Sequence, residues 1–180
     1  SRDIKKAIHY YQLSADQNYV PSLFQLGAIL YKGKYVIKDV KKAIQYLQIA
    51  ADKNDACAQN FLGDIYLNSQ YVEKDINKSI YYFKLAADQN DKMAQSNLGN
   101  VYMDIDINKS IHYYSLAANQ NFVYAQFILG NLYYENDRIP RDVDKSINYL
   151  TLAANQNYPP ALNNLGSIYH NGHYVTKDIY

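Results

Sequence analysis

The chain has 180 residues, of which 18 are Lys or Arg and 17 are Asp or Glu, so its formal net charge at pH 7 is +1. This balance argues against a protein built around a nucleic-acid backbone or an anionic membrane surface, and no stretch is long and apolar enough to span a bilayer. The single cysteine, Cys57, excludes a disulfide framework and favours an intracellular, cytoplasmic location.

The sequence repeats itself, and the equivalent segments open at five aspartates: Asp3, Asp39, Asp75, Asp106 and Asp142. The spacing is 36 residues, except for 31 between Asp75 and Asp106. Such a period is typical of solenoids built from stacked two-helix units. We therefore expect an all-α fold, a single αα-hairpin repeat solenoid (superhelix) with five repeats. Its expected boundaries are 3–38, 39–74, 75–105, 106–141 and 142–177, with the start of a sixth repeat at 178–180.

The first half of each repeat predicts an amphipathic helix. In the second repeat one apolar stripe at helical spacing contains Val40, Ala43, Ile44, Leu47, Ala50 and Ala51. The opening aspartate stands where an N-cap belongs, because its carboxylate can accept from the free backbone N–H groups of the first turn. An asparagine stands where a left-handed residue should end the helix: Asn18, Asn54, Asn90, Asn121 and Asn157.

The second half of each repeat predicts another helix, and each copy contains an internal glycine: Gly27, Gly63, Gly99, Gly130 and Gly166. A glycine there costs about 1 kcal/mol relative to alanine, so we expect a helix backbone to pack closely against each one. The double small residues late in the first helices would allow that approach: Ser14-Ala15, Ala50-Ala51, Ala86-Ala87, Ala117-Ala118 and Ala153-Ala154.

The third repeat is five residues shorter than the others, because only Asp104 and Ile105 separate Met103 from the next aspartate. The deletion removes loop and leaves both helical patterns intact. It predicts a tight turn and a changed twist at this point, not the loss of a repeat.

The second half of one repeat and the first half of the next together resemble the Sel-one-like repeat (SLR), a relative of the tetratricopeptide repeat. The resemblance is carried by Ala125-Gln-Phe-Ile-Leu-Gly130-Asn-Leu-Tyr133-Tyr followed by Asp142-Val-Asp-Lys-Ser-Ile147-Asn-Tyr149-Leu-Thr-Leu-Ala153-Ala154. It extends over essentially the whole chain. In the repeat unit of that family, the helix that contains the Leu-Gly pair (here Leu129-Gly130) comes first, and we call such helices the Leu-Gly helices. The resemblance implies a non-catalytic adaptor that binds other proteins, outside the cysteine-rich secreted branch.

The sequence offers no catalytic site and no motif for a cofactor. His9 and His112 share one repeat position on the polar side of the first helix, which indicates surface histidines. His170 and His173 have a spacing that can bind a metal, but no third ligand accompanies them, so we predict no metal site. Cys57 lacks a neighbour that would activate its thiol and is interpreted as a partly exposed packing residue.

A partner is expected on the concave face, which the resemblance assigns to the Leu-Gly helices. The informative positions on these helices are those that vary between repeats, and they form three rows. The first row is Phe24, Asn60, Ser96, Phe127 and Asn163. The second row is Ala28, Asp64, Asn100, Asn131 and Ser167. The third row is Tyr31, Leu67, Met103, Tyr134 and His170. Asparagine amides could hold an extended peptide, and the apolar members could accept its side chains; ordinary solvated positions are the alternative interpretation.

This face carries no Lys or Arg between Pro21 and Tyr31, nor over the matching stretch of any other repeat. A clamp for a terminal carboxylate needs such cations, so we predict that there is none. The expected partner is another protein, as an extended segment or a helix, with no nucleic acid and no membrane insertion.

Two other interpretations of the array stay open. It could be the regulatory or substrate-recruiting part of a larger enzyme, of the kinase or ubiquitin-ligase type, or a permanent structural component of a large assembly. Ser1-Arg2 resembles the tail of an inter-repeat loop, and 178–180 resembles the start of a repeat. We therefore expect the chain to be an internal piece of a longer array.

Overall fold

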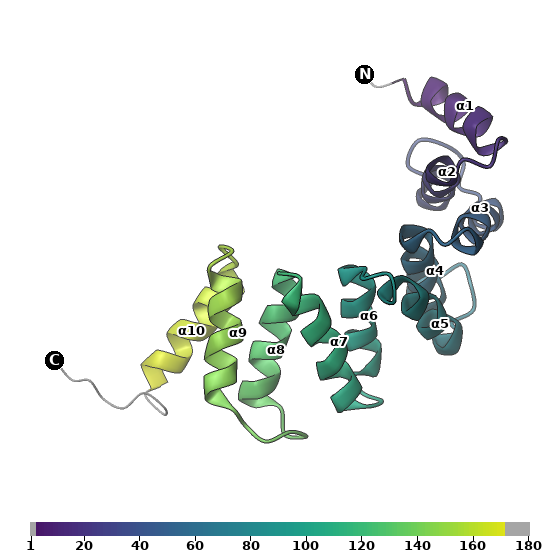
Figure 1. The fold of residues 1–180 in the computed structure, drawn as a ribbon. Helices are drawn as coiled ribbons and strands as arrows, with labels where there is room; N and C mark the ends of the chain where they lie inside the picture. Colours follow the sequence, from purple (N-terminus) through teal and green to yellow (C-terminus); the bar gives the residue numbers. More distant parts are fainter. Residues whose placement is uncertain (1–2, 172–180) are drawn as a thin grey trace. The chain divides into compact units, whose positions relative to one another are not determined.

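The computed structural model describes residues 3–171, and these residues form ten α-helices and no strand (Figure 1). In chain order the helices are α1 (Ile4–Ala15), α2 (Val20–Lys32), α3 (Val40–Asp52), α4 (Ala56–Asn68), α5 (Ile76–Ala87), α6 (Lys92–Tyr102), α7 (Ile107–Asn119), α8 (Val123–Glu135), α9 (Val143–Ala154) and α10 (Pro159–Asn171). The expected all-α repeat solenoid is confirmed. Ser1-Arg2 and the start of a sixth repeat lie outside the described residues.

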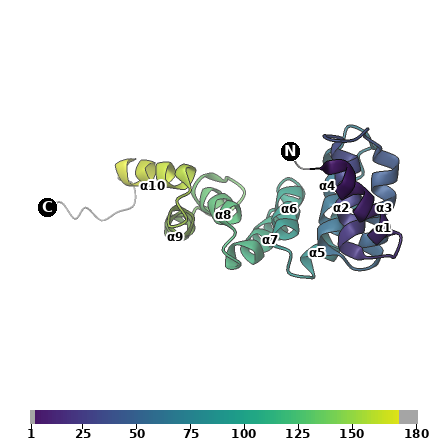
Figure 2. The ribbon, with the colours of Figure 1, turned by 90° about the horizontal axis from the view of Figure 1, so that it is seen from above.

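The chain divides into two compact units, Ser1–Ala94 and Gln95–Tyr180, and the division falls within α6. In the first unit α1, α2, α3 and α4 each pack against the next helix along the chain, up to α5. In the second unit α7, α8, α9 and α10 follow one another in the same way, as both views show (Figures 1 and 2). Each repeat therefore supplies a first helix with an odd number and a second helix with an even number.

The opening aspartates cap the first helices, as predicted. In each repeat the carboxylate accepts a hydrogen bond from the backbone N–H three residues later, for example Lys42 to Asp39 at 2.9 Å and Lys145 to Asp142 at 3.0 Å. The same bond forms at Asp3, Asp75 and Asp106. The backbone N–H of Lys145 donates to Asp142 and is the main cause that lowers the pKa of this carboxyl. The backbone N–H of Lys109 does the same for the pKa of Asp106. One capping chemistry thus begins every first helix.

The asparagines after the first helices adopt the left-handed conformation that the sequence predicts. Their φ angles lie between 56° at Asn121 and 65° at Asn54. The five are the only non-glycine residues with positive φ in residues 3–171: Asn18, Asn54, Asn90, Asn121 and Asn157. Because the chain reverses through the same geometry each time, the second helix starts from an equivalent place in every repeat.

Four of the five helix glycines are packed tightly. The predicted close helix backbone is present at Gly27, where a Cβ would lie 3.1 Å from the Ala43 carbonyl oxygen, but the double small residues are not among the nearest atoms. A Cβ on Gly63 would lie 2.5 Å from Cδ1 of Phe83, and one on Gly27 would lie 2.6 Å from Cγ of Leu47. Tyr114 fills the same place against Gly99, and Leu150 against Gly130. These large side chains come from the first helix of the next repeat, not from the double small residues. The glycine is a notch that admits a bulky side chain across the junction between repeats.

The double small residues instead lie against the start of their own second helix. Ala50, for example, is fully buried, and its carbonyl accepts a hydrogen bond from the N–H of Asp55 at 3.1 Å. The side chain of Gln59 then donates to the carbonyl of Ala51 at 3.1 Å. Small side chains are needed here because the next helix begins directly over them.

Buried glutamines join successive repeats. Gln59 is 1% exposed, and besides its bond to Ala51 its amide oxygen accepts from Gln89 of the next repeat at 2.7 Å. Gln126 repeats this arrangement, with Ala118 as acceptor and Gln156 as donor. Leu23 occupies the position of Gln59 in the first repeat, and Lys53 occupies the position of Gln89 in the second. The polar pair is therefore replaced at both positions together.

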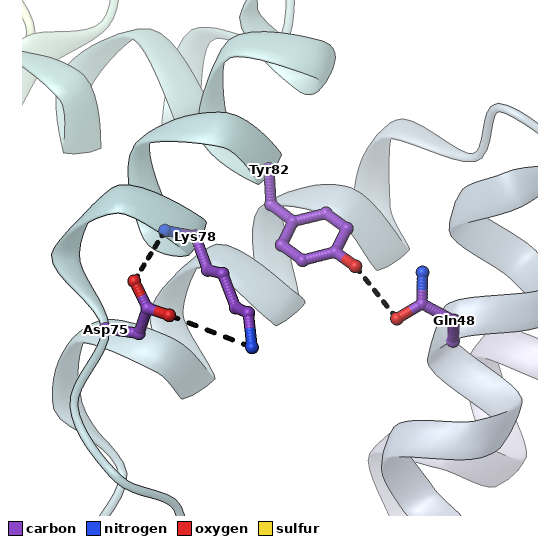
Figure 3. A network of polar contacts seen from close by, with 4 residues as sticks. All are labelled: Gln48, Asp75, Lys78 and Tyr82. Atoms are coloured by element: carbon purple, nitrogen blue, oxygen red, sulfur yellow. Dashed lines mark hydrogen bonds and ion pairs between the residues drawn. The ribbon is translucent and has the colours of Figure 1, made fainter.

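Stacked tyrosines form a second link between repeats. Tyr66 of α4 and Tyr82 of α5 are stacked with ring centroids 5.7 Å apart, and Nζ of Lys78 lies 5.1 Å from the Tyr66 centroid. Figure 3 shows Lys78 held by the Asp75 carboxylate, while the Tyr82 hydroxyl donates to Gln48 at 2.8 Å. The same stack joins Tyr102 to Tyr113 and Tyr133 to Tyr149. Many of the abundant tyrosines thus serve packing between repeats.

Two buried serines at the same repeat position allow a matched stability test. Ser79 and Ser110 are both 0% exposed, but the Ser110 hydroxyl donates to the Gly99 carbonyl at 2.8 Å, whereas the Ser79 hydroxyl has no partner. Ala43 occupies this position in the second repeat. We expect Ser79→Ala to raise the free energy of unfolding by about 1 kcal/mol and Ser110→Ala to lower it by a similar amount. Urea denaturation of both variants checks this, and equal losses would contradict it.

The short third repeat has the expected tight turn. α6 ends at Tyr102, whose carbonyl accepts from the N–H of Ile105 at 3.1 Å and from that of Asp106 at 2.8 Å. Only three residues therefore separate the end of α6 from Asp106, which caps α7. Both helices of the repeat are present, as predicted, and the changed twist stays a prediction.

Candidate protein-interaction surface

The three variable rows lie on the second helices, and we call their fifteen residues the second-helix surface. Four of them are exposed: Asn100, Asn163, Ser167 and His170. Ser96 is buried, with 3% exposure. The remaining members are half-buried: Phe24, Ala28, Tyr31, Asn60, Asp64, Leu67, Met103, Phe127, Asn131 and Tyr134. The surface is therefore accessible unevenly, and most openly on α6 and α10.

The aromatic members pack against the following repeat. The rings of Phe24 and Tyr31 contact Phe61 of α4 edge-on, with centroid separations of 6.3 and 5.4 Å. Phe127 contacts Tyr158 in the same way at 5.2 Å. Packing thus constrains these variable positions, because residues at the start of or within the next second helix cover part of each ring. They form a half-buried floor between second helices.

The polar members already make hydrogen bonds inside the array. The Asn100 amide oxygen accepts the hydroxyl of Tyr114, a buried ring whose pKa is raised by its burial. Asn131 accepts from the amide nitrogen of Asn164 at 2.9 Å, and Asp64 accepts from Asn68 at 2.8 Å. In these bonds Asn100 and Asn131 act through their amide oxygens, so the bonds do not use the N–H donors of these amides.

A hollow of about 260 Å³ brings two of the predicted residues together. Met103, at the end of α6, and Asn131 of α8 line it, and we call it the α6–α8 hollow; its other lining residues are Ile128, Leu132, Glu135 and Asn136. Three of its lining residues are apolar and three are polar, namely two amides and the carboxylate of Glu135. Its volume is below the roughly 300–1,000 Å³ of typical small-molecule pockets, so it suits one or two side chains of a peptide.

Arg138 is a neighbour of this hollow that sequence reasoning missed. It lies in the loop after α8, and its guanidinium donates to the backbone carbonyl of Met103. At the matching loop position of the second repeat stands Tyr71, whose hydroxyl accepts from Lys38 of the preceding loop at 2.9 Å. The short third repeat supplies no such loop, and Arg138 reaches the end of α6 instead. Comparison of the loops could have signalled this, because the tyrosine is lost where the preceding loop is lost.

The residues weighed as chemical candidates lie apart from one another. His9 and His112 are exposed, as expected for surface histidines, and His170 is exposed at the end of α10. His173 lies outside the described residues. Within residues 3–171 no three His, Cys, Asp or Glu side chains gather as a metal ion would require.

Cys57 is exposed, and partial burial of its thiol is the main cause that raises its pKa, with the charges of Asp55 and Asp91 adding to the effect. A raised pKa leaves little thiolate at neutral pH, which opposes a nucleophilic role. None of the helices in the described part of the chain is long and apolar enough to cross a membrane.

Comparison with protein families and solved structures gives a consistent result. The Sel1 repeat matches residues 1–19, 20–55, 58–91, 92–122, 123–158 and 159–180. After the first segment, the matches begin at or within α2, α4, α6, α8 and α10, in the phase that the Leu-Gly helix sets. A comparison with curated protein sequences finds no match.

Among solved structures, a Sel1 repeat protein from Oxalobacter formigenes is 30% identical with a TM-score of 0.85, over 99% of this chain and 75% of that one. A protective antigen of uropathogenic Escherichia coli strains that displays an SLR fold is 27% identical with a TM-score of 0.88. This chain is covered to 99% in that match but spans only 39% of the antigen. A Sel1 repeat protein from Klebsiella pneumoniae, 20% identical with a TM-score of 0.59 over 93% of this chain and 86% of that one, shares the fold.

Proposed function

Because the chain belongs to the Sel1 repeat family, we propose that it is a scaffold that binds a partner polypeptide on the second-helix surface. Proteins of this family generally mediate protein–protein interactions, and their fold is typically a non-catalytic scaffold. The observation that carries the placement is the α6–α8 hollow, in which Met103 and Asn131 from successive second helices line one concavity.

An extended peptide segment fits this surface better than the surface of a folded domain does. The hollow has room for one or two apolar side chains, while the amide N–H donors of Asn100 and Asn131, which those two bonds do not use, suit the carbonyls of a peptide backbone. Further along the second unit, α10 continues the surface with Asn163, Ser167 and His170, which are exposed. Such a partner would be held mainly by hydrogen bonds to its own backbone along its length. Few of its side chains would be deeply inserted.

Affinity capture on the intact chain, followed by mass spectrometry, tests the placement. The variant Asn131→Ala with Glu135→Lys changes the wall of the hollow at a half-buried amide and an exposed carboxylate. Asn100 is left intact, because its removal would unpair the buried Tyr114 hydroxyl and mix a folding defect with a binding defect. We expect this variant to lose the partners that the original chain retains.

The matched control is His112→Ala with Asn148→Ala, at exposed positions of α7 and α9 in the same unit. It should retain the partners, and circular dichroism should show equal helicity for both variants. If the variant Asn131→Ala with Glu135→Lys still captures the partners while the control loses them, the proposed binding surface is contradicted.

The partner should not need a free terminal carboxylate. No Lys or Arg lies between Pro21 and Tyr31 or over the matching stretches, and the nearby Arg138 is engaged by the Met103 carbonyl. A captured segment made as a peptide should therefore bind equally well with a free or an amidated C-terminus. A tenfold or larger preference for the free acid would contradict this.

A further inference from the structure

The junction between the first and second repeats lacks a contact that the later junctions share. At each of the three later junctions a tyrosine of the second helix stacks on a tyrosine of the next first helix, as Tyr66 does on Tyr82. Before α3 the position of Tyr66 is occupied by Leu30, so Tyr46, the counterpart of Tyr82, has no second-helix ring to stack on. The Tyr46 ring is half-buried, and its hydroxyl donates to Gln12 at 3.0 Å.

The lysine of this junction lacks the ion pair that its equivalents form. In the other four repeats the lysine three residues after the opening aspartate pairs with it, as Lys145 does with Asp142 at 2.9 Å. The backbone N–H of Lys42 caps Asp39 at 2.9 Å, but its ammonium forms no ion pair within residues 3–171. That ammonium lies 5.8 Å from the ring centroid of Tyr46. Its charge is therefore not neutralised by a carboxylate.

Lys42 and Tyr46 line a hollow of about 560 Å³ on the outer side of α3. Its other lining residues are Ile44, Gln45, Gln48 and Ile49. The two isoleucines and the tyrosine offer apolar surface, and Ile49 is 40% exposed. Gln45 and Lys42 offer N–H donors beside that surface. Because all six residues belong to one helix, the hollow suits a segment that lies across the helix better than an enclosed small molecule.

Lysines concentrate at the start of α3. Residues 32–42 contain five lysines and one aspartate, whereas the matching residues 68–78 of the next repeat contain two lysines and two acidic residues. The five are exposed and form no ion pair in the part of the chain that the structure describes: Lys32, Lys34, Lys38, Lys41 and Lys42. Lys41 lies one turn before Gln45 and so on the same side of α3. A positive potential therefore surrounds one end of the hollow.

The other end of α3 is acidic, which limits the length of an anion that the helix can hold. Asp52 is exposed and accepts from the amide of Gln48 at 3.1 Å. The 13 residues of α3 extend over about 20 Å, a distance that about six residues of extended chain cover. A long polyanion such as a nucleic acid would run on to Asp52 and be repelled. A short acidic segment would meet only the lysines.

We propose that the outer side of α3 is a second interaction surface, which binds a short acidic segment of a partner polypeptide. The carboxylates of the segment lie at Lys41 and Lys42, and one apolar side chain lies against Tyr46 and Ile49. Charge complementarity identifies this occupant, because no carboxylate of the described chain neutralises these two lysines and apolar surface lies directly beside them. The surface is on a first helix, so the inference does not depend on the second-helix surface.

Fluorescence anisotropy of the intact chain with a set of labelled peptides tests this proposal. Each peptide has about eight residues, slightly more than the helix can hold, with acetylated and amidated ends, several Asp or Glu residues and a single Leu or Phe whose place varies. At least one peptide should bind the original chain, and its affinity should fall as the salt concentration rises. Replacing its acidic residues by serine, or its apolar residue by serine, should weaken binding in both cases.

Two variants of α3 separate the charged and the apolar contributions. Lys41→Glu with Lys42→Glu reverses the charge and keeps the backbone N–H that caps Asp39. It should weaken binding of the acidic peptide by at least about tenfold, and it should bind a peptide with lysines in place of the acidic residues more tightly than the original chain does. Ile49→Gln should weaken binding by about threefold or more without a change of charge. Circular dichroism should show equal helicity for both variants.

The matched control is Lys5→Glu with Lys6→Glu, at the same repeat positions on α1 and with the same change in net charge. It should bind the acidic peptide nearly as the original chain does, because the attraction is local to α3. The proposal is overturned if no peptide binds the original chain, if the control loses as much affinity as the α3 charge variant, or if neither α3 variant weakens binding. A single-stranded oligonucleotide of the same charge that binds more tightly than the peptide would also overturn it.

Discussion

Replacing Phe83 by alanine should lower the free energy of unfolding by about 3–5 kcal/mol, the loss typical of removing a fully buried ring. Phe83 is 1% exposed, and its ring occupies the notch at Gly63, where an added Cβ would lie 2.5 Å from Cδ1. The substitution leaves a cavity at the junction between α4 and α5. Thermal or urea unfolding followed by circular dichroism measures the loss.

The notch itself supplies the reciprocal test. Gly63→Ala should lower stability by about 1–3 kcal/mol through overpacking, whereas the control Gly166→Ala should raise it by up to about 1 kcal/mol, because alanine is the better helix former and meets no neighbour. Combining Gly63→Ala with Phe83→Ala should cost less than the two losses added, since the new methyl group fills part of the cavity. Additive losses, or equal losses for the two glycine variants, would contradict the notch.

Gln126→Glu should lower the free energy of unfolding by about 3 kcal/mol or more at neutral pH, as an uncompensated buried charge does. Gln126 is 1% exposed; its amide nitrogen donates to the Ala118 carbonyl at 3.3 Å, and its amide oxygen accepts from Gln156 at 2.8 Å. The substituted carboxylate has the same shape, but it has no proton for Ala118 once it is ionised. It would place two oxygens against each other in a buried site.

The loss should depend on pH in a defined direction. Burial raises the pKa of the introduced carboxyl in the folded state above its ordinary value of about 4.3. The penalty is therefore smallest below about pH 4, grows as pH rises from the unfolded to the folded pKa, and stays constant above the folded pKa. Unfolding free energies of the variant and the original chain, compared at each pH, measure this. Gln156→Glu, at an exposed position, is the control and should lose less. A loss that does not change with pH would contradict a buried carboxylate.

The features predicted correctly from the sequence act within one repeat. Asp39 and Asn54, for example, set the beginning and the end of a single helix through their own backbone, so residue type and position suffice to assign them. The positions of the helices follow, because each pair is connected by the same short turn.

The features that the sequence analysis missed or mispredicted connect different repeats. The double small residues were expected to lie opposite Gly63, but its nearest neighbour is the ring of Phe83 from the next repeat. The pairing of Gln59 with Gln89 spans 30 residues and leaves no mark on helical periodicity. The joint replacement of the two positions by Leu23 in the first repeat and Lys53 in the second was an available signal.

The second-helix surface was predictable only in part for the same reason. Variation between repeats identified Met103 and Asn131, which share the α6–α8 hollow. It also selected Phe24, which varies although it packs against Phe61, because several side chains can fill that half-buried space. The α6–α8 hollow and the amides of the second unit are the features on which the proposed function rests.

Hydrogen exchange on the chain with its captured partner, compared with the chain alone, tests the proposed binding surface most directly. We expect new protection at the ends of α6 and α8 that line the hollow, around Met103 and Glu135, and on α10 around Ser167. The first helices α7 and α9 should exchange as before. Protection confined to α7 and α9, at the partly exposed Leu116 and Leu152, would place the partner on the opposite helices and contradict the proposal.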